Sequence, residues 1–261
     1  MNTLVFDIET IPDIAGGRKL YDLGDELDDA EVAKAMFHLR YQKVGNEFLP
    51  HHLQRVAAIS VTFRGRGDEF KVWSLGDESA EEAELIQRFY DGIDRYTPTL
   101  VSWNGGGFDL PVLHYRAMQH KISAPRYWDM GGDDSSFKWN NYISRYHTRH
   151  TDLMDLLAMY TGRANAPLDE LATLYGFPGK MGMSGARVWD AYQAGELAAI
   201  RHYCETDVLN TWLVYLRFEL MRGHLDHTQY QRECELVRQV LQASGKAHLQ
   251  AFEQAWAVDD T

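Results

Sequence analysis

The segment LVFDIET at residues 4–10 constrains this chain most, because it places two acids inside a short apolar run. Successive side chains of a strand alternate between its two faces, so Asp7 and Glu9 point to the same face. Phe6 and Ile8 point to the opposite face, into a core. Neighbouring carboxylates repel each other unless a cation lies between them, and hard cations such as Mg²⁺ bind carboxylate oxygens. The segment therefore predicts a metal site, with an acidic strand face in solvent as the alternative.

The composition narrows the class of protein. The 261 residues carry a formal net charge of −12 and are 45% hydrophobic, so a sizeable core is possible. This charge argues against a nucleic-acid binder held by a broad basic face. It leaves room for an enzyme that contacts phosphates through metal ions and a local cationic groove. Cys204 and Cys234 form no C-x-x-C pair, so neither a disulfide framework nor a zinc site is expected.

The sequence also bears on location. The first residues lack a basic segment followed by an apolar stretch, so we expect no signal peptide. No apolar run approaches the length that a transmembrane helix needs, so we expect no membrane contact. A cytoplasmic setting is therefore the expectation.

Hydrophobic periodicity predicts strands that alternate with helices, the pattern of an α/β fold. Residues 18–43 read as a mostly helical, acidic excursion, and residues 129–147 read as a long loop, functional or mobile. Ser79 and Glu82 predict a capping box at a helix start. The expected strands cover residues 4–10, 56–63, 69–74 and 99–103, and the expected longer helices cover residues 79–96, 110–120, 196–220 and 228–243.

A second acidic motif, NGGGFDLP, occupies residues 104–111. It follows a predicted strand and opens a predicted helix, which is the usual place for ligands in open α/β sheets. Its glycines let the backbone come close to a partner. Asp109 lies near the helix N-terminus, so it is either a helix cap or a functional carboxylate.

A third motif, HYCETD at residues 202–207, lies inside the predicted long helix. Tyr203 and Asp207 are four residues apart, one helical turn, and therefore share a face. Glu205 points elsewhere, and we expect it to lie in solvent.

Together the three motifs resemble the DEDD superfamily of 3′–5′ exonucleases, above all the proofreading exonuclease domain of family B DNA polymerases. The likeness spans residues 3 to about 215, and we expect no polymerase modules in the residues that follow. The resemblance implies a ribonuclease-H-like fold, with a mixed five-stranded sheet and helices on both faces. We expect that domain at residues 1–221, with residues 222–261 as a helical appendage packed on it. The matching residues are Asp7 and Glu9 in F-D-I-E-T, then Asn104, Phe108, Asp109 and Pro111 in N-x-x-x-F-D-x-P, and Tyr203 and Asp207 in Y-x-x-x-D.

The resemblance also implies the chemistry. Two divalent ions, Mg²⁺ or Mn²⁺, would support hydrolysis of single-stranded or frayed nucleic acid, DNA more readily than RNA, from its 3′ end to nucleoside 5′-monophosphates. Asp7 would bridge both ions, and Tyr203 would orient the attacking water. The implied metal ligands are Asp7, Glu9, Asp109 and Asp207.

Substrate contacts are expected around the motifs. Phe108 either stacks on a base or packs in the core, and Asn104 either binds substrate or shapes its loop. Lys180 and Arg187 lie in a glycine-rich stretch that suits a phosphate-contacting loop, and Thr10 follows the acids of the first motif. Asp152 is predicted to cap a helix, with support of the site as the alternative.

Several alternatives stay open. His202 and Asp207 fit the H-x-x-x-x-D motif of the superfamily's histidine branch. In a helix His202 would lie about 140° from Asp207, whereas Tyr203 would lie within about 40°, which favours the tyrosine branch. The rival functions are a histidine-branch exoribonuclease, a catalytically weak nucleic-acid-binding module and a proofreading subunit. A polymerase or repair protein is a possible partner.

Overall fold

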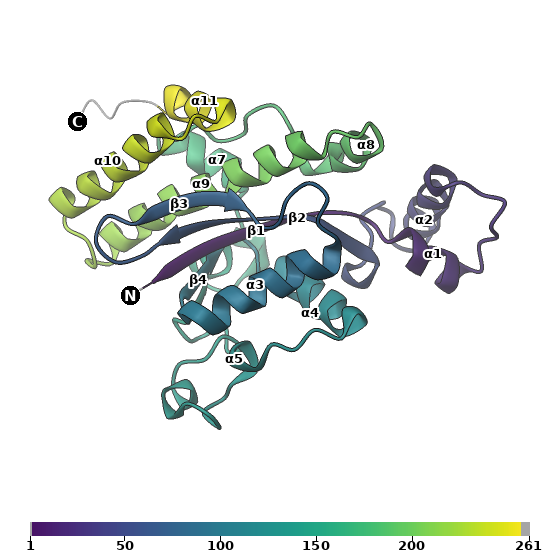
Figure 1. Ribbon diagram of the computed structural model, residues 1–261, viewed down its shortest axis with the longest axis horizontal. Coiled ribbons are helices and arrows are strands. Elements are labelled where there is room, and N and C mark those ends of the chain that lie inside the picture. Colours follow the sequence, from purple (N-terminus) through teal and green to yellow (C-terminus); the bar gives the residue numbers. More distant parts are fainter. Residues whose placement is uncertain (1, 257–261) are drawn as a thin grey trace.

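A five-stranded mixed sheet forms the centre of the protein (Figure 1). The computed structural model describes residues 2–256. The strand order is β3-β2-β1-β4-β5; β2 pairs antiparallel with β1 and β3, and β4 pairs parallel with β1 and β5. This confirms the predicted α/β fold with a ribonuclease-H-like sheet. The strands are β1 (Thr3–Pro12), β2 (Gln54–Arg64), β3 (Phe70–Ser74), β4 (Thr99–Ser102) and β5 (His150–Asp152).

Helices cover both faces of this sheet, as predicted (Figure 1). One face carries α3 (Glu82–Tyr96), α4 (Asp109–His120) and the short α5 (Pro125–Trp128). The other face carries α9 (Leu197–Met221), with α7 (Leu168–Leu174) and α8 (Val188–Gln193) beside it. Within residues 2–256, no helix is both long and apolar enough to cross a membrane.

The central strand β1 separates two cores. Phe6 and Ile8 pack with the helices of the α3 side, whereas Val5 packs with the residues of α9. Asp7 and Glu9 therefore share the face that α9 covers, which confirms the alternation expected from the sequence. The pairing register of β1 with β2 shifts between Glu9 and Thr10, where the strand bulges.

Two C-terminal helices, α10 (His227–Ala243) and α11 (Ala247–Ala255), pack against α9. Val237, Leu241 and Phe252 are fully buried in the same cluster as Trp212 of α9. They lie where the helical appendage was expected. Its boundary at residue 222 stays a prediction, and residues 257–261 lie outside the described part.

The acidic excursion forms two helices at one end of the molecule, α1 (Ile14–Tyr21) and α2 (Asp29–Val44) (Figure 1). Val32 and Met36 are buried there with Leu49 and Leu53 in a small core of their own. The predicted helical character of this segment is confirmed.

The start of α3 differs from the prediction. The helix begins at Glu82, its N-cap is Glu81, and the hydroxyl of Ser79 bonds to Asp77 instead. The expected capping box is therefore wrong. The carboxylate of Glu82 binds the buried guanidinium of Arg116 and accepts two hydrogen bonds from it, at 2.7 and 2.5 Å.

The stretch of residues 129–147 packs into the core on the α3 side of the sheet. Its Phe137 and Tyr142 are buried in the core, and the Tyr142 hydroxyl donates to the Pro98 carbonyl at 2.6 Å. The Asp129 carboxylate accepts backbone N–H groups from Gly131 and the following residues. The shorter elements of the chain are η1 (His51–Leu53), η2 (Ser135–Lys138), α6 (Leu153–Leu157), η3 (Gly162–Ala164) and η4 (Gly185–Arg187).

Candidate active site

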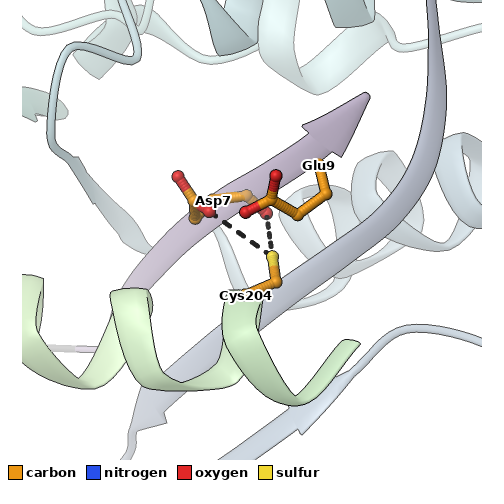
Figure 2. A group of neighbouring side chains, drawn as sticks. All are labelled: Asp7, Glu9 and Cys204. Atoms are coloured by element: carbon orange, nitrogen blue, oxygen red, sulfur yellow. Dashed lines mark hydrogen bonds between the residues drawn. The ribbon is translucent and has the colours of Figure 1, made fainter. Parts of the chain in front are cut away.

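The acids of β1 face α9 at close range. Figure 2 shows Asp7 and Glu9 pointing toward Cys204, and one ligand atom from each of the three lies within 4.8 Å of the others. The Cys204 thiol lies 3.4 Å from both the backbone oxygen and Oδ2 of Asp7. This thiol holds one carboxylate oxygen of Asp7 in place.

Asp109 reaches the same place from α4. It is 3% exposed, and its Oδ1 accepts the backbone N–H of Ile8 at 3.0 Å. The parallel pairing of β1 with β4 ends at Val5, so this N–H lies beyond the ladder and needs another acceptor. Phe108 is the N-cap of the helix and Asp109 is its first residue, so the capping alternative for Asp109 is wrong.

Tyr203 and Asp207 approach from α9. Both side chains line one small cavity, and the charge of Asp207 raises the pKa of the Tyr203 phenol, as expected for residues one turn apart on the same face. His202 is exposed, and its ring stacks on that of His248 in α11 with centroids 3.8 Å apart. Because α9 already begins at Leu197, His202 lies within the helix, as the sequence predicted.

The pKa values of the four carboxyl groups in the site are all raised. Burial raises the pKa of Asp7 well above its usual range, and the charges of Asp109, Glu9 and Asp207 raise it further. Burial and the neighbouring charges of Asp207 and Asp109 raise the pKa of Glu9 in the same way. Burial raises the pKa of Asp109 and of Asp207 to about 7 each. The charge of Lys180 lowers the pKa of Asp207 but does not outweigh burial, and the oxygen donors of the cluster suit hard divalent cations.

Two residues of α9 differ from the sequence reading. Cys204 was given no role, although it precedes Asp207 by three residues, which places it about 60° away on the same helical face. Glu205 was expected in solvent but is 3% exposed, and that expectation is wrong. Its carboxylate accepts the Ser74 N–H at 2.9 Å and bonds the His248 ring at 2.7 Å.

The low pKa of Glu205 reflects the hydrogen bonds and positive charge around its carboxylate. Burial alone would raise the pKa, but the hydrogen bond of His248 and the charge of Lys246 outweigh burial and lower it to about 2. The sequence reading failed here because α9 is covered on two sides. The sheet lies on one side, and α11 lies on another.

Two of the expected substrate residues lie beside the acids. Asn104 and Phe108 line a cavity of about 420 Å³, here called the carboxylate cavity, together with Asp7 and Asp109. The Phe108 ring is half-buried and packs against Phe48, with centroids 5.5 Å apart. Both readings of Phe108, stacking and packing, therefore remain compatible with its position.

Three further candidates are placed differently. Lys180 shares a smaller cavity of about 110 Å³, here called the tyrosine cavity, with Tyr203 and Asp207. Arg187 lines another cavity beside α8, and none of the four acids lies in its wall. The Thr10 hydroxyl donates to Gln54 at 2.9 Å. The structure thus brings Lys180 to the acids and leaves Arg187 apart.

Asp152 joins the second motif to the end of β5. Its carboxylate accepts the backbone N–H groups of Asn104 at 3.0 Å and Gly106 at 2.8 Å. It also accepts that of Asp155 at 3.3 Å, so the predicted helix cap is confirmed and a second function is added. Asn104 takes a left-handed backbone conformation at this point, with φ 63°.

The sheet and its helices form a ribonuclease-H-like fold, on which acids from β1, α4 and α9 lie near one another. Residues 46–256 match the family described as "Predicted 3′-5′ exonuclease related to the exonuclease domain of PolB", and the chain belongs to this family. That match contains the second and third motifs. The first motif, with Asp7 and Glu9, precedes it.

Comparisons with solved structures and with curated proteins give weaker similarity than the family match. The family B DNA polymerase from the hyperthermophilic archaeon Pyrobaculum calidifontis is similar over 85% of this chain, with 17% sequence identity and a TM-score of 0.49. The chain spans 24% of that polymerase. Comparison with curated proteins finds no match.

Proposed function

We propose that this chain is a metal-dependent 3′–5′ exonuclease that hydrolyses single-stranded or frayed nucleic acid, DNA more readily than RNA. The products would be nucleoside 5′-monophosphates. The observation that carries the proposal is the meeting of Asp7, Glu9, Asp109 and Asp207, all with raised pKa values. Membership of a family of predicted 3′–5′ exonucleases supports it.

The four acids are proposed as ligands of two divalent ions, Mg²⁺ or Mn²⁺. Their oxygen donors and their unbalanced negative charge fit such ions. When bound, the ions supply an activated water and stabilise charge on the phosphoryl oxygens. Asp109 is fixed by the N–H of Ile8, and the Cys204 thiol orients Asp7, so the protein presents these oxygens in a set arrangement.

Tyr203 is proposed to orient the attacking water. Burial raises the pKa of its phenol, and the neighbouring charge of Asp207 raises it further, so the hydroxyl keeps its proton at neutral pH. A protonated phenol donates a hydrogen bond and cannot act as a base. Tyr203 lies in α9 on the same helical face as Asp207, and this position supports assignment of the chain to the tyrosine branch of the superfamily.

The terminal nucleotide is proposed to enter the carboxylate cavity. Phe108 would stack on its base and Asn104 would hydrogen-bond to it, since both line this cavity beside Asp7. Lys180 would contact the phosphate from the tyrosine cavity. The positions of Thr10 and Arg187 give their proposed substrate contacts no further support.

Tyr203→Phe should lower turnover by about 10- to 100-fold, at or below the low end of acid–base effects, without loss of metal binding. The phenyl ring keeps its place in α9 but no longer donates to water. His202→Ala is the matched control on the adjacent position, and it should leave the rate near that of the wild type. Initial rates on a labelled oligonucleotide across pH 5.5–9 measure both changes.

The pH profile gives a second readout of the same pair. At saturating Mg²⁺ the profiles of the wild type and His202→Ala should coincide, with no limb near pH 6.5, where an unperturbed histidine titrates, that the substitution removes. Suppose instead that His202→Ala is inactive while Tyr203→Phe keeps its rate. The histidine branch would then be the correct assignment.

The need for a free end tests the proposed function itself. A linear single-stranded DNA should be degraded, whereas a circular strand of the same sequence should stay intact. The RNA of that sequence should be degraded more slowly than the DNA. Cleavage of the circle would contradict exonuclease action, and faster RNA hydrolysis would reverse the proposed preference.

A further inference from the structure

A second cavity opens next to the carboxylate cavity. It measures about 500 Å³, within the range of about 300–1,000 Å³ that is typical of ligand sites. Its walls come from the loop of the second motif, from residues 142–148 and from the segment around α6. We call it the aromatic cavity. Asn104, Met154 and Asn165 line both cavities, so the two are adjacent.

The outer wall of the aromatic cavity presents aromatic rings on which a nucleobase can stack. The rings of Tyr146 and Tyr160 meet edge to face with centroids 5.0 Å apart. The Arg145 guanidinium lies 4.9 Å from the Tyr160 ring centre, and its Nη2 contacts Asp155 at 2.5 Å. Tyr146 is 70% exposed, so one large ring faces open space. Rings of this kind bind bases regardless of sequence, and arginine adds a cation–π contribution.

The backbone holds Tyr160 in place at an energetic cost. Met159 and Tyr160 have φ values of 53° and 60°, in the left-handed region that non-glycine residues adopt only under backbone strain. The Tyr160 N–H donates to the Asp155 carbonyl at 2.8 Å, which closes the turn after α6. The strained turn brings the Tyr160 ring into the cavity wall.

Three cavities follow one another in series. The tyrosine cavity and the carboxylate cavity share Leu168, and the carboxylate cavity in turn meets the aromatic cavity. A water oriented by Tyr203 attacks the phosphorus in line with the departing 3′ oxygen. The strand that keeps this oxygen therefore leaves on the side away from Tyr203, toward the aromatic cavity.

We propose that the aromatic cavity binds a nucleobase of the substrate strand on the 5′ side of the scissile phosphodiester, stacked against Tyr146 and Tyr160. The proposal rests on the proposed exonuclease function. It assigns the upstream strand a site separate from the one that holds the terminal nucleotide. Arg145 and Arg222 also line the cavity. Arg145 pairs with Asp155 and Arg222 with Glu219, so a phosphate of that strand would share these guanidinium groups with the two acids.

A scan with abasic nucleotides tests this assignment. Each oligonucleotide carries one abasic residue at the second, third or fourth position from the 3′ end, and a label on the terminal nucleotide reports the first turnover. For wild type, kcat/KM should fall at one of these positions by about 5- to 150-fold, which corresponds to the ~1–3 kcal/mol of one stacked base. The other positions should change little.

Two variants connect that loss to the cavity. Tyr146→Ala should be slow on the intact strand and lose little more at the sensitive position, because the stacking ring is already absent. Trp139→Ala is the matched control, since this ring is 85% exposed in the same stretch and does not line the cavity. It should behave as wild type does. Thermal unfolding of both variants verifies that they fold.

The outcomes separate the two proposals. A flat scan, or an abasic loss that is the same in Tyr146→Ala as in wild type, would overturn the cavity assignment while exonuclease activity stands. An absence of hydrolysis with Mg²⁺ and Mn²⁺ would count against the proposed function. The same scan read as binding of fluorescent oligonucleotides in Ca²⁺ then tests the cavity, and equal affinity for all strands would overturn it.

Discussion

Asp7→Ala should reduce nucleotide release by about 10³-fold or more, the largest loss expected for any single substitution in this chain. Bound metal contributes several kcal/mol to stabilisation of the transition state, and each 1.36 kcal/mol is a factor of about ten in rate. Asp7 is the acid whose pKa is raised by three others, Asp109, Glu9 and Asp207, so its charge interacts with all of them. Initial rates with saturating Mg²⁺ measure the change.

The stability of Asp7→Ala gives the control. Carboxyl groups with raised pKa values hold protons in the folded state that the unfolded chain has already released. The folded state is therefore destabilised progressively as pH rises from about 4 toward 7. Removal of Asp7 relieves part of this repulsion, so without metal the variant should melt at or above the wild-type temperature at pH 8. At pH 4 the difference should disappear.

Asp91→Ala is the matched variant, an exposed acid on α3, on the opposite side of the sheet from α9. It should keep both the rate and the melting temperature of the wild type. A collapse in the melting temperature of Asp7→Ala at pH 8 would mean that Asp7 has a structural function. An active Asp7→Ala would contradict the proposed metal site.

Arg116→Met should lower the free energy of unfolding by about 3–5 kcal/mol, the usual cost of leaving buried charges unpaired. Arg116 is 3% exposed, and it binds Glu82 and Asp13 at distances down to 2.5 Å. Glu82 also accepts the Val56 N–H at 2.7 Å, so the cluster joins α4 to α3, to β2 and to the residue that caps α1. For a chain of this size, roughly 6–20 °C of melting temperature should be lost.

Two variants show whether charge is the cause. Arg88→Met removes a pair with Glu84 in which both side chains are about half exposed, and it should cost no more than about 0.5 kcal/mol. Adding Glu82→Gln to Arg116→Met removes one unpaired carboxylate and should recover part of the loss. If Arg116→Met unfolds no earlier than Arg88→Met, the buried cluster does not stabilise the fold.

Much of the site could be predicted because each motif depends on local geometry. The alternation of β1 places Asp7 and Glu9 on one face, and the turn of α9 pairs Tyr203 with Asp207. These are short-range rules of strands and helices. They required no knowledge of which other elements lie nearby.

The failures all came from contacts between distant segments. Glu205 is buried because α11, more than forty residues later, covers its side of α9. Glu82, the second member of the predicted capping box with Ser79, is instead bound by Arg116 from another helix. The aromatic cavity likewise needs Tyr146 and Tyr160 to meet across a loop and a strained turn. Sequence periodicity contains no record of such pairings.

The most direct test of the proposed function is a time course on single-stranded DNA labelled at its 5′ end. With Mg²⁺ or Mn²⁺ the labelled strand should shorten by one nucleotide at a time. EDTA should stop this shortening, and added metal should restore it. Shortening that continues after thorough chelation would contradict metal-dependent hydrolysis, and immediate release of the 5′ label as a mononucleotide would contradict the 3′–5′ polarity.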